Sequence, residues 1–325
     1  MTSFLHPRLL ADIGGTNARF ALQQRDGIEQ VRVLACAAFA TLGDAMRHYL
    51  DDCGAEVRHA ALGIANPVQG DHLRMTNHHW EFSIEALRRE LGLDTLLVLN
   101  DFAALALALP LLPPHELQTV GGGRSDPAAP RVVLGAGTGL GVGALLRQRD
   151  GSWHALAGEG GHVSFSPADD DEAELWRFAR ARHGHVSAER LLCGRGLELI
   201  HAWLSARDGV AESACDAATI TQQALNGSDA RCMRALDMFC AMLGTLAGNL
   251  ALTFDARGGV YVGGGIVPRL GEYFSRSPFR ERFEAKGRFA SSLAHIPTHV
   301  IHSPWPGLLG AGAALQNLLD EPRHA

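Results

Sequence analysis

The chain has 325 residues, long enough for two domains with sizeable cores, and its 46% hydrophobic and 20% charged residues are typical of a soluble globular protein. Its net charge of −6 argues against a nucleic-acid groove or an anionic membrane surface as partner. No C-x-x-C pair occurs among the six cysteines and no apolar run approaches transmembrane length, so we expect reduced thiols and a cytoplasmic location.

The first predicted element is a β-hairpin. Strands at 9–13 and 18–22 flank a turn at Gly14, Gly15 and Thr16. Glycine lets a backbone approach a phosphate closely, and successive amides form an anion cradle. Asp12 beside this turn suits a phosphate-bound Mg²⁺. An ordinary tight hairpin is the alternative interpretation.

The remaining patterns predict two α/β domains. Residues 1–110 contain further strands and helices, and a stretch rich in proline and glycine over 110–130 separates them from the second domain. That domain repeats the opening pattern, because strands at 131–134 and 142–146 flank a turn containing Gly137, Thr138 and Gly139. Predicted helices follow at 172–183, 187–192, 220–225 and 234–252, then strands at 259–262 and 298–301 and a last helix at 308–319.

A third glycine turn, at 263–265, again follows a strand, and the three turns lie more than 100 residues apart. Ligands of open α/β sheets bind at strand ends, so the set predicts a nucleotide held between two domains. The P-loop pattern is absent, and Lys286 is the single lysine, which argues against P-loop and protein-kinase schemes. A dinucleotide pattern at Gly139, Gly141 and Ala144 would require a helix where a strand is predicted.

Carboxylates and a histidine occupy positions suited to catalysis. Asp101 follows Asn100 between a strand and a helix, where a carboxylate can accept the proton of an attacking hydroxyl, although a helix cap is the alternative. Glu159 and His162 lie in a glycine-rich loop, and Glu189 lies in the first turn of a helix. Glutamates accept hydrogen bonds from paired sugar hydroxyls well. A helix-dipole partner for Glu189 and a core histidine for His162 remain alternatives.

An ordered set of motifs from about residue 9 to 315 resembles bacterial glucokinase. The motifs are residues 11–19 (Ala-Asp-Ile-Gly-Gly-Thr-Asn-Ala-Arg), 75–78 (Met-Thr-Asn-His), 100–104 (Asn-Asp-Phe-Ala-Ala), 135–141 (Gly-Ala-Gly-Thr-Gly-Leu-Gly), 158–162 (Gly-Glu-Gly-Gly-His), 185–190 (His-Val-Ser-Ala-Glu-Arg), 263–269 (Gly-Gly-Gly-Ile-Val-Pro-Arg) and 306–312 (Pro-Gly-Leu-Leu-Gly-Ala-Gly). The lack of a cysteine cluster after His162 indicates the zinc-free branch rather than the repressor/kinase branch.

The resemblance implies an α/β, two-domain actin-like ATPase (ribonuclease H-like) fold with an interdomain active-site cleft. The small domain would comprise residues 1–110, completed by a C-terminal helix at about 302–320, and the large domain residues 111–301. The implied reaction is ATP-dependent phosphorylation of D-glucose at the 6-hydroxyl, giving glucose 6-phosphate and ADP, by a cytoplasmic homodimer. A kinase for another hexose, a non-catalytic sugar-binding regulator and an actin-like assembly protein remain alternatives.

The resemblance also implies residue roles. Asp101 would be the general base on the 6-hydroxyl. Asp12 would hold Mg²⁺ through water. Glucose would be bound by Asn100, Asp101, Glu159, His162 and Glu189. ATP would contact Ala11, Asp12, Ile13, Gly14, Gly15, Thr16, Gly137, Thr138, Gly139, Gly264 and Gly265.

Overall fold

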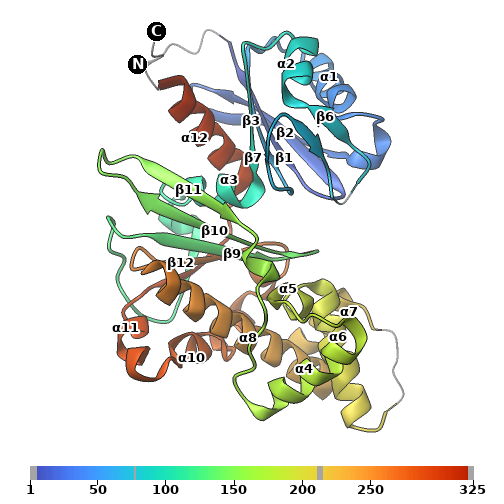
Figure 1. The fold of residues 1–325 in the computed structure, drawn as a ribbon, viewed down its shortest axis with the longest axis vertical. Helices are drawn as coiled ribbons and strands as arrows, with labels where there is room; N and C mark the ends of the chain where they lie inside the picture. Colours follow the sequence, from blue (N-terminus) through green and yellow to red (C-terminus); the bar gives the residue numbers. More distant parts are fainter. Residues whose placement is uncertain (1–5, 77, 211–214, 321–325) are drawn as a thin grey trace. The chain divides into compact units, whose positions relative to one another are not determined.

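The computed structural model describes residues 6–76, 78–210 and 215–320, so Asn77 of the motif at 75–78 lies outside the described residues. The chain divides into two compact units (Figure 1). Unit 1 comprises Met1–Leu112, Trp153–Ala157 and Ser303–Ala325, and unit 2 comprises Pro113–Ser152 and Gly158–His302.

Unit 1 is built on a five-stranded sheet with the order β3-β2-β1-β4-β7. β2 pairs antiparallel with β1 and β3, whereas β4 is parallel to both β1 and β7. The strands are β1 (Arg8–Ile13), β2 (Asn17–Gln24), β3 (Gly27–Ala35), β4 (His59–Ile64) and β7 (Thr95–Asn100). The predicted hairpin is confirmed, with Gly14 N–H donating to the carbonyl of Asn17 at 3.0 Å across the turn.

Both faces of this sheet are covered, so every residue of β1 except Asp12 is buried. Leu9 and Ile13 point into a core shared with α1 (Leu42–Cys53) and α2 (Ile84–Glu90). Leu10 points to the opposite face, where it packs with residues of the C-terminal helix α12 (Pro306–Asp320). This alternation follows from the two-residue period of a strand. α12 thereby ties the end of the chain to its beginning.

A six-stranded sheet, of which β8, β9, β10, β12 and β13 belong to unit 2, has the order β11-β10-β9-β12-β13-β8 and repeats the design of the first sheet. β10 is antiparallel to β9, β12 is parallel to β9, and β13 is parallel to β12, just as β2, β4 and β7 are arranged around β1. The strands are β8 (Leu117–Val120), β9 (Arg131–Ala136), β10 (Leu140–Arg147), β11 (Trp153–Gly158), β12 (Val260–Gly263) and β13 (Thr298–Ile301). The predicted duplication is confirmed, and β10 excludes the helix that a dinucleotide fingerprint needs.

The core of unit 2 is organised around α8 (Ala230–Phe254). By length and composition this helix could span a membrane, contrary to the sequence-based expectation, but 78% of its most apolar window is buried within the structure. Two glycines let α10 (Phe279–Glu284) approach closely: a Cβ on Gly244 or Gly248 would lie 2.2 or 2.5 Å from a backbone carbonyl oxygen of α10. The long apolar sequence of α8 is therefore that of a core helix.

The remaining elements complete both units. They are β5 (His72–Arg74), β6 (Glu81–Ser83), α3 (Asp101–Ala108), α4 (Asp170–His183), α5 (Ala188–Leu191), α6 (Gly194–Arg207), α7 (Ala217–Leu225), α9 (Glu272–Arg276), α10 (Phe279–Glu284) and α11 (Ala290–Ala294). α6 was not predicted from the sequence, because its first turn holds two glycines, which are poor helix formers. Tertiary packing overrides that preference, since a Cβ on Gly196 would lie 2.4 Å from the Leu191 backbone.

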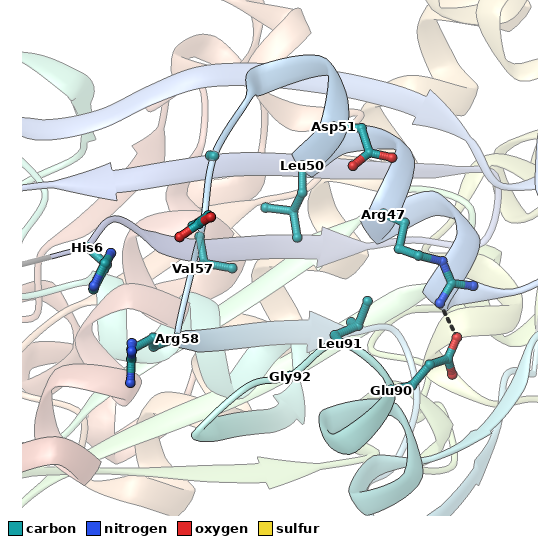
Figure 2. A pocket seen from close by; sticks show the side chains of 11 residues that line it. His6, Arg47, Leu50, Asp51, Val57, Arg58, Glu90, Leu91 and Gly92 are labelled. Carbon is teal, nitrogen blue, oxygen red and sulfur yellow. Dashed lines mark hydrogen bonds and ion pairs between the residues drawn. The ribbon is translucent and has the colours of Figure 1, made fainter.

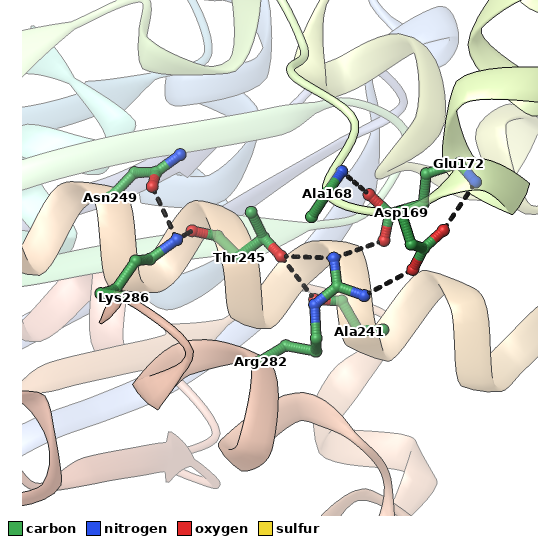
Figure 3. Close-up of polar contacts among 8 residues, drawn as sticks. All are labelled: Ala168, Asp169, Glu172, Ala241, Thr245, Asn249, Arg282 and Lys286. Carbon is green, nitrogen blue, oxygen red and sulfur yellow. Dashed lines mark hydrogen bonds and ion pairs between the residues drawn. The ribbon is translucent and has the colours of Figure 1, made fainter. Parts of the chain in front are cut away.

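A buried polar network joins α4, α8 and the α10 region (Figure 3). The Glu172 side chain is 2% exposed and accepts a hydrogen bond from Arg282 Nη2 at 2.6 Å. Arg282 also donates to Asp169 Oδ2 at 2.9 Å and to Thr245 Oγ1 at 3.1 Å. Lys286 donates to the Thr245 carbonyl at 3.0 Å and to Asn249 Oδ1 at 2.8 Å. The single lysine thus serves the scaffold of unit 2.

The contact between α12 and α3 gives a first prediction. A Cβ on Gly310 would lie 1.7 Å from the Ala104 carbonyl oxygen, a backbone atom that cannot move aside cheaply. We expect Gly310→Ala to destabilise the protein by about 3 kcal/mol, measured by calorimetric unfolding. Asn317→Ala on the exposed side of α12 is the control and should change stability by less than about 0.5 kcal/mol. Equal stability of both variants would contradict this packing.

The buried network gives a second prediction, because Arg282→Met leaves Glu172 without its cation. We expect a loss of about 3–5 kcal/mol near neutral pH, the usual cost of breaking a buried ion pair. Burial raises the pKa of Glu172 despite Arg282, and removing Arg282 should raise it further.

A carboxyl group whose folded-state pKa is raised favours the folded state below that pKa and loses this contribution as the pH rises through it. The penalty of Arg282→Met should therefore be larger at about pH 7 than at about pH 5, as denaturant unfolding at both values would show. The double variant with Glu172→Gln should lack this dependence. A penalty that does not change with pH in the single variant would contradict the role given to Glu172.

Candidate active site

Three strands of unit 1 deliver polar residues to one edge of its sheet. β1, β4 and β7 run parallel, and Ile13, Ile64 and Asn100 lie in register at their carboxyl ends. Asp12 and Asp101 are thus about 10 Å apart in the direction of the strand pairing, two strand spacings. Gly63 of β4 lies between them, with a Cβ there 3.8 Å from the Ala11 carbonyl oxygen and 3.7 Å from the Asp101 Cα. Carboxyl ends of parallel strands are where open α/β sheets bind ligands.

Asp12 lies opposite Arg19 in the β1–β2 register, and Arg19 Nη1 donates to Asp12 Oδ2 at 3.1 Å. Burial raises the pKa of Asp12, and Arg19 opposes this shift. Gly307 in the first turn of α12 faces the same carboxylate, since a Cβ there would lie 3.2 Å from Asp12 Cγ. The glycine keeps this face of the carboxylate open, so Asp12 fits a role as a ligand, directly or through water, of a phosphate-bound Mg²⁺.

Asn100 and Asp101 share the start of α3. Asn100 is the N-cap: its Oδ1 accepts from Phe102 N–H at 3.0 Å and from Ala103 N–H at 3.1 Å. Asp101 is the first helical residue, and its Oδ1 accepts from Asn100 Nδ2 at 3.0 Å and from Phe102 N–H at 2.9 Å. The alternative that Asp101 is itself the cap is therefore wrong, because Asn100 performs that function.

In unit 2, the second and third glycine turns are neighbours. The turn at Gly137 follows β9 and the turn at Gly264 follows β12, and these strands are parallel and adjacent. A Cβ on Gly137 would lie 3.7 Å from Gly265 N, and a Cβ on Gly264 only 2.4 Å from the Ala136 carbonyl oxygen. Gly264 also has a φ of 85°, a backbone conformation that favours glycine. Two of the three predicted turns thus form one surface; the first turn belongs to unit 1.

The sugar-binding candidates of unit 2 surround the start of β10. Glu189 Oε2 accepts from Leu140 N–H at 2.8 Å, and α5 is tied to the neighbouring loop by Ala188 N–H, which donates to the Val163 carbonyl at 2.9 Å. His162 Nε2 and Glu159 Oε2 are 3.7 Å apart on side chains that are more than half exposed. His162 is therefore not a core histidine, and the glycines at 160 and 161 let its loop lie against β10.

Three residues near the candidate site were not predicted from the sequence: Arg19, Asn66 and Gly307. Asn66 follows β4 at the same edge, and its carbonyl accepts from Asn100 Nδ2 at 3.4 Å. The signal for Arg19 was its place in the hairpin opposite Asp12, whereas no sequence signal brings Gly307 to Asp12. Ala11 and Ile13 are fully buried, so only their backbone atoms are suited to a ligand.

A pocket of about 550 Å³ elsewhere in unit 1 contains none of the predicted site residues (Figure 2). It lies between the end of α1 and the segment after α2, and its lining carries both signs of charge, including Arg47 paired with Glu90. The pocket is therefore separate from the candidate site at the strand ends.

Comparison with known proteins identifies the family. The glucokinase family model matches residues 9–318. The glucokinase of Chromobacterium violaceum is 58% identical over 315 residues, covering 96% of this chain and 90% of that protein. The glucokinase of Neisseria meningitidis serogroup C is 54% identical over 316 residues, covering 97% of this chain and 96% of that protein.

Solved structures agree in fold. The glucokinase from an Antarctic psychrotroph has a TM-score of 0.87 at 36% identity, with 96% of this chain and 99% of that chain covered. A ROK family glucokinase from Streptomyces griseus, in complex with glucose and AMPPNP, has a TM-score of 0.66 at 19% identity, with coverages of 96% and 99%. These neighbours confirm the predicted two-domain actin-like ATPase fold. The chain therefore belongs to the glucokinase family, enzymes that use ATP to phosphorylate glucose.

Proposed function

We propose that this chain transfers the γ-phosphoryl group of ATP to O6 of D-glucose with Asp101 as general base. The observation that carries this proposal is that Asp12 and Asp101 lie at the same edge of one sheet. Asp12 is suited to the nucleotide and its metal ion, and Asp101 is suited to the attacking hydroxyl. Asp101 Oδ1 is held by Asn100 Nδ2 and Phe102 N–H. That fixation orients the carboxylate before the hydroxyl proton is transferred.

The proposed sugar ligands come from both units. Asn100 and Asp101 of unit 1 and Glu159, His162 and Glu189 of unit 2 would hydrogen-bond the glucose hydroxyls. A carboxylate accepts from two hydroxyls at once, which supports the choice of the glutamates. Exposure of Glu159 and His162 on a glycine-rich loop leaves both side chains accessible to a ligand.

The proposed nucleotide ligands are mainly backbone amides. Residues 11–16 and the turn at Gly137, Thr138 and Gly139 would contact the phosphates, and Gly264 and Gly265 would flank the adenosine. Asp12 would hold Mg²⁺ through water, and that ion would neutralise charge on the phosphates. Arg19 keeps the Asp12 carboxylate in place for this role. On the family resemblance we also propose a homodimer in the cytoplasm.

Sugar choice is the part of this proposal that a coupled assay tests first. With Mg·ATP and a panel of glucose, mannose, fructose and glucosamine, we expect the highest kcat/KM on glucose. If kcat/KM is higher for another hexose, the proposed phosphoryl transfer stands, but glucose is not the preferred substrate. No turnover with any sugar, together with stabilisation of the fold by glucose, would favour a sugar-binding regulator.

The general base gives a separate prediction. Asp101→Asn keeps the hydrogen-bonding shape but removes the proton acceptor, so we expect kcat to fall by about 10²–10⁴ while the glucose Kd changes only a few-fold. Glu85→Gln is the matched control, a carboxylate in the first turn of another helix of unit 1, and it should retain the parent kcat. Near-parental kcat in Asp101→Asn would assign the base role elsewhere.

A further inference from the structure

Glu189 lies directly over the glycine turn at residues 137–139 of unit 2. Its Oε2 accepts from Leu140 N–H at 2.8 Å, and a Cβ on Gly139 would lie 2.5 Å from the same oxygen and 3.4 Å from Cδ. The φ of Gly139 lies outside the left-handed region. Position 139 therefore requires glycine for space, and the occupant of that space is a carboxylate of the protein itself.

Leu140 also contacts the loop that carries Glu159 and His162. A Cβ on Gly161 would lie 2.0 Å from the Leu140 carbonyl oxygen, so that loop packs against the peptide group that follows Leu140, while Glu189 binds the N–H of the peptide group that precedes it. The Leu140 N–H thus supports Glu189, and its carbonyl oxygen lies against the loop of Glu159.

Glu189 retains capacity for a ligand. Within residues 6–76, 78–210 and 215–320, its Oε1 accepts no hydrogen bond, while Oε2 is held by Leu140. The side chain is half-buried, and α5 is fixed by the Ser187 cap on Arg190 N–H at 3.2 Å. One oxygen positions the carboxylate and the other is available to a hydroxyl group.

We infer that Gly139 is a positioning residue for the sugar: it makes the room in which the Leu140 amide holds the Glu189 carboxylate in its sugar-binding position. This inference rests on the proposed role of Glu189 in glucose binding. It gives the glycine turn a second purpose beside the proposed phosphate contact. A substitution within the nucleotide turn should therefore damage binding of the sugar in the absence of nucleotide.

Gly139→Ala tests this, with Gly122→Ala as the control glycine elsewhere in unit 2. A Cβ at 122 meets nothing closer than the Ala294 carbonyl oxygen at 3.9 Å, an ordinary contact, and residue 122 has no proposed role in binding. By calorimetric titration of the full-length protein with glucose and no nucleotide, we expect the Kd to rise about tenfold or more in Gly139→Ala, the usual effect of losing a hydrogen bond to a charged group. Gly122→Ala should stay within about twofold of the parent.

The double variant with Glu189→Ala separates this mechanism from a general disturbance. If Gly139 acts through Glu189, Gly139→Ala adds less than about twofold once Glu189 is removed. Additive effects would overturn the inference, as would an unchanged Kd in Gly139→Ala. An unfolded Gly139→Ala protein would also overturn it, because the clash is with the movable end of a side chain.

The result that would contradict the proposed function differs from the result that would contradict the role of Gly139. If Glu189→Ala alone leaves the glucose Kd unchanged, Glu189 is not a sugar ligand and the proposed site is wrong. If Glu189→Ala weakens glucose binding but Gly139→Ala does not, the site stands and only the positioning role of Gly139 is wrong.

Discussion

The constraint on which the site depends is the parallel arrangement of strands around β1 in unit 1 and β9 in unit 2. Parallel strands leave the sheet at a common edge, so segments far apart in the sequence end beside one another. Strand register brings Asp12 and Asn100 to this edge, and the Asn66 carbonyl accepts a hydrogen bond from Asn100 Nδ2. The same geometry in unit 2 makes the turns at Gly137 and Gly264 neighbours. Each unit therefore concentrates backbone amides and polar side chains at one edge.

The glycines of the three turns serve different physical purposes. Gly264 combines a left-handed backbone with close contact to Ala136, and Gly139 makes room for Glu189. Gly265 has nothing within 4 Å of its Cβ position, and Gly137 meets only an ordinary contact. Contacts within the protein therefore explain why positions 264 and 139 hold glycine. The open space beside Gly265 is suited to close approach of a nucleotide.

Charge is used differently in the two units. In unit 2, Arg282 and Lys286 satisfy buried acceptors on α4 and α8, so the single lysine supports the fold. In unit 1, Arg19 pairs with a carboxylate at the sheet edge itself. The phosphate contacts proposed above therefore rely on backbone amides, whose direction is set by strand and helix ends rather than by a flexible lysine.

The sequence by itself determined the α/β fold class, the hairpin around Gly14 and Gly15, the repeated strand–turn–strand design and the family, because strand periodicity, glycine turns and ordered motifs are local signals. It also predicted the strand-end positions of Asn100 and Asp101 and the helical first turn of Glu189. Only the tertiary structure decided that Asn100 rather than Asp101 caps α3, that Arg19 and Gly307 meet Asp12, and that Glu189 lies over Gly139. The contacts of Gly307 with Asp12 and of Glu189 with Gly139 depend on packing between distant segments, which no local pattern encodes. The cap and the Arg19–Asp12 pair are local contacts, but they depend on the residue at which β7 ends and on the register of the hairpin.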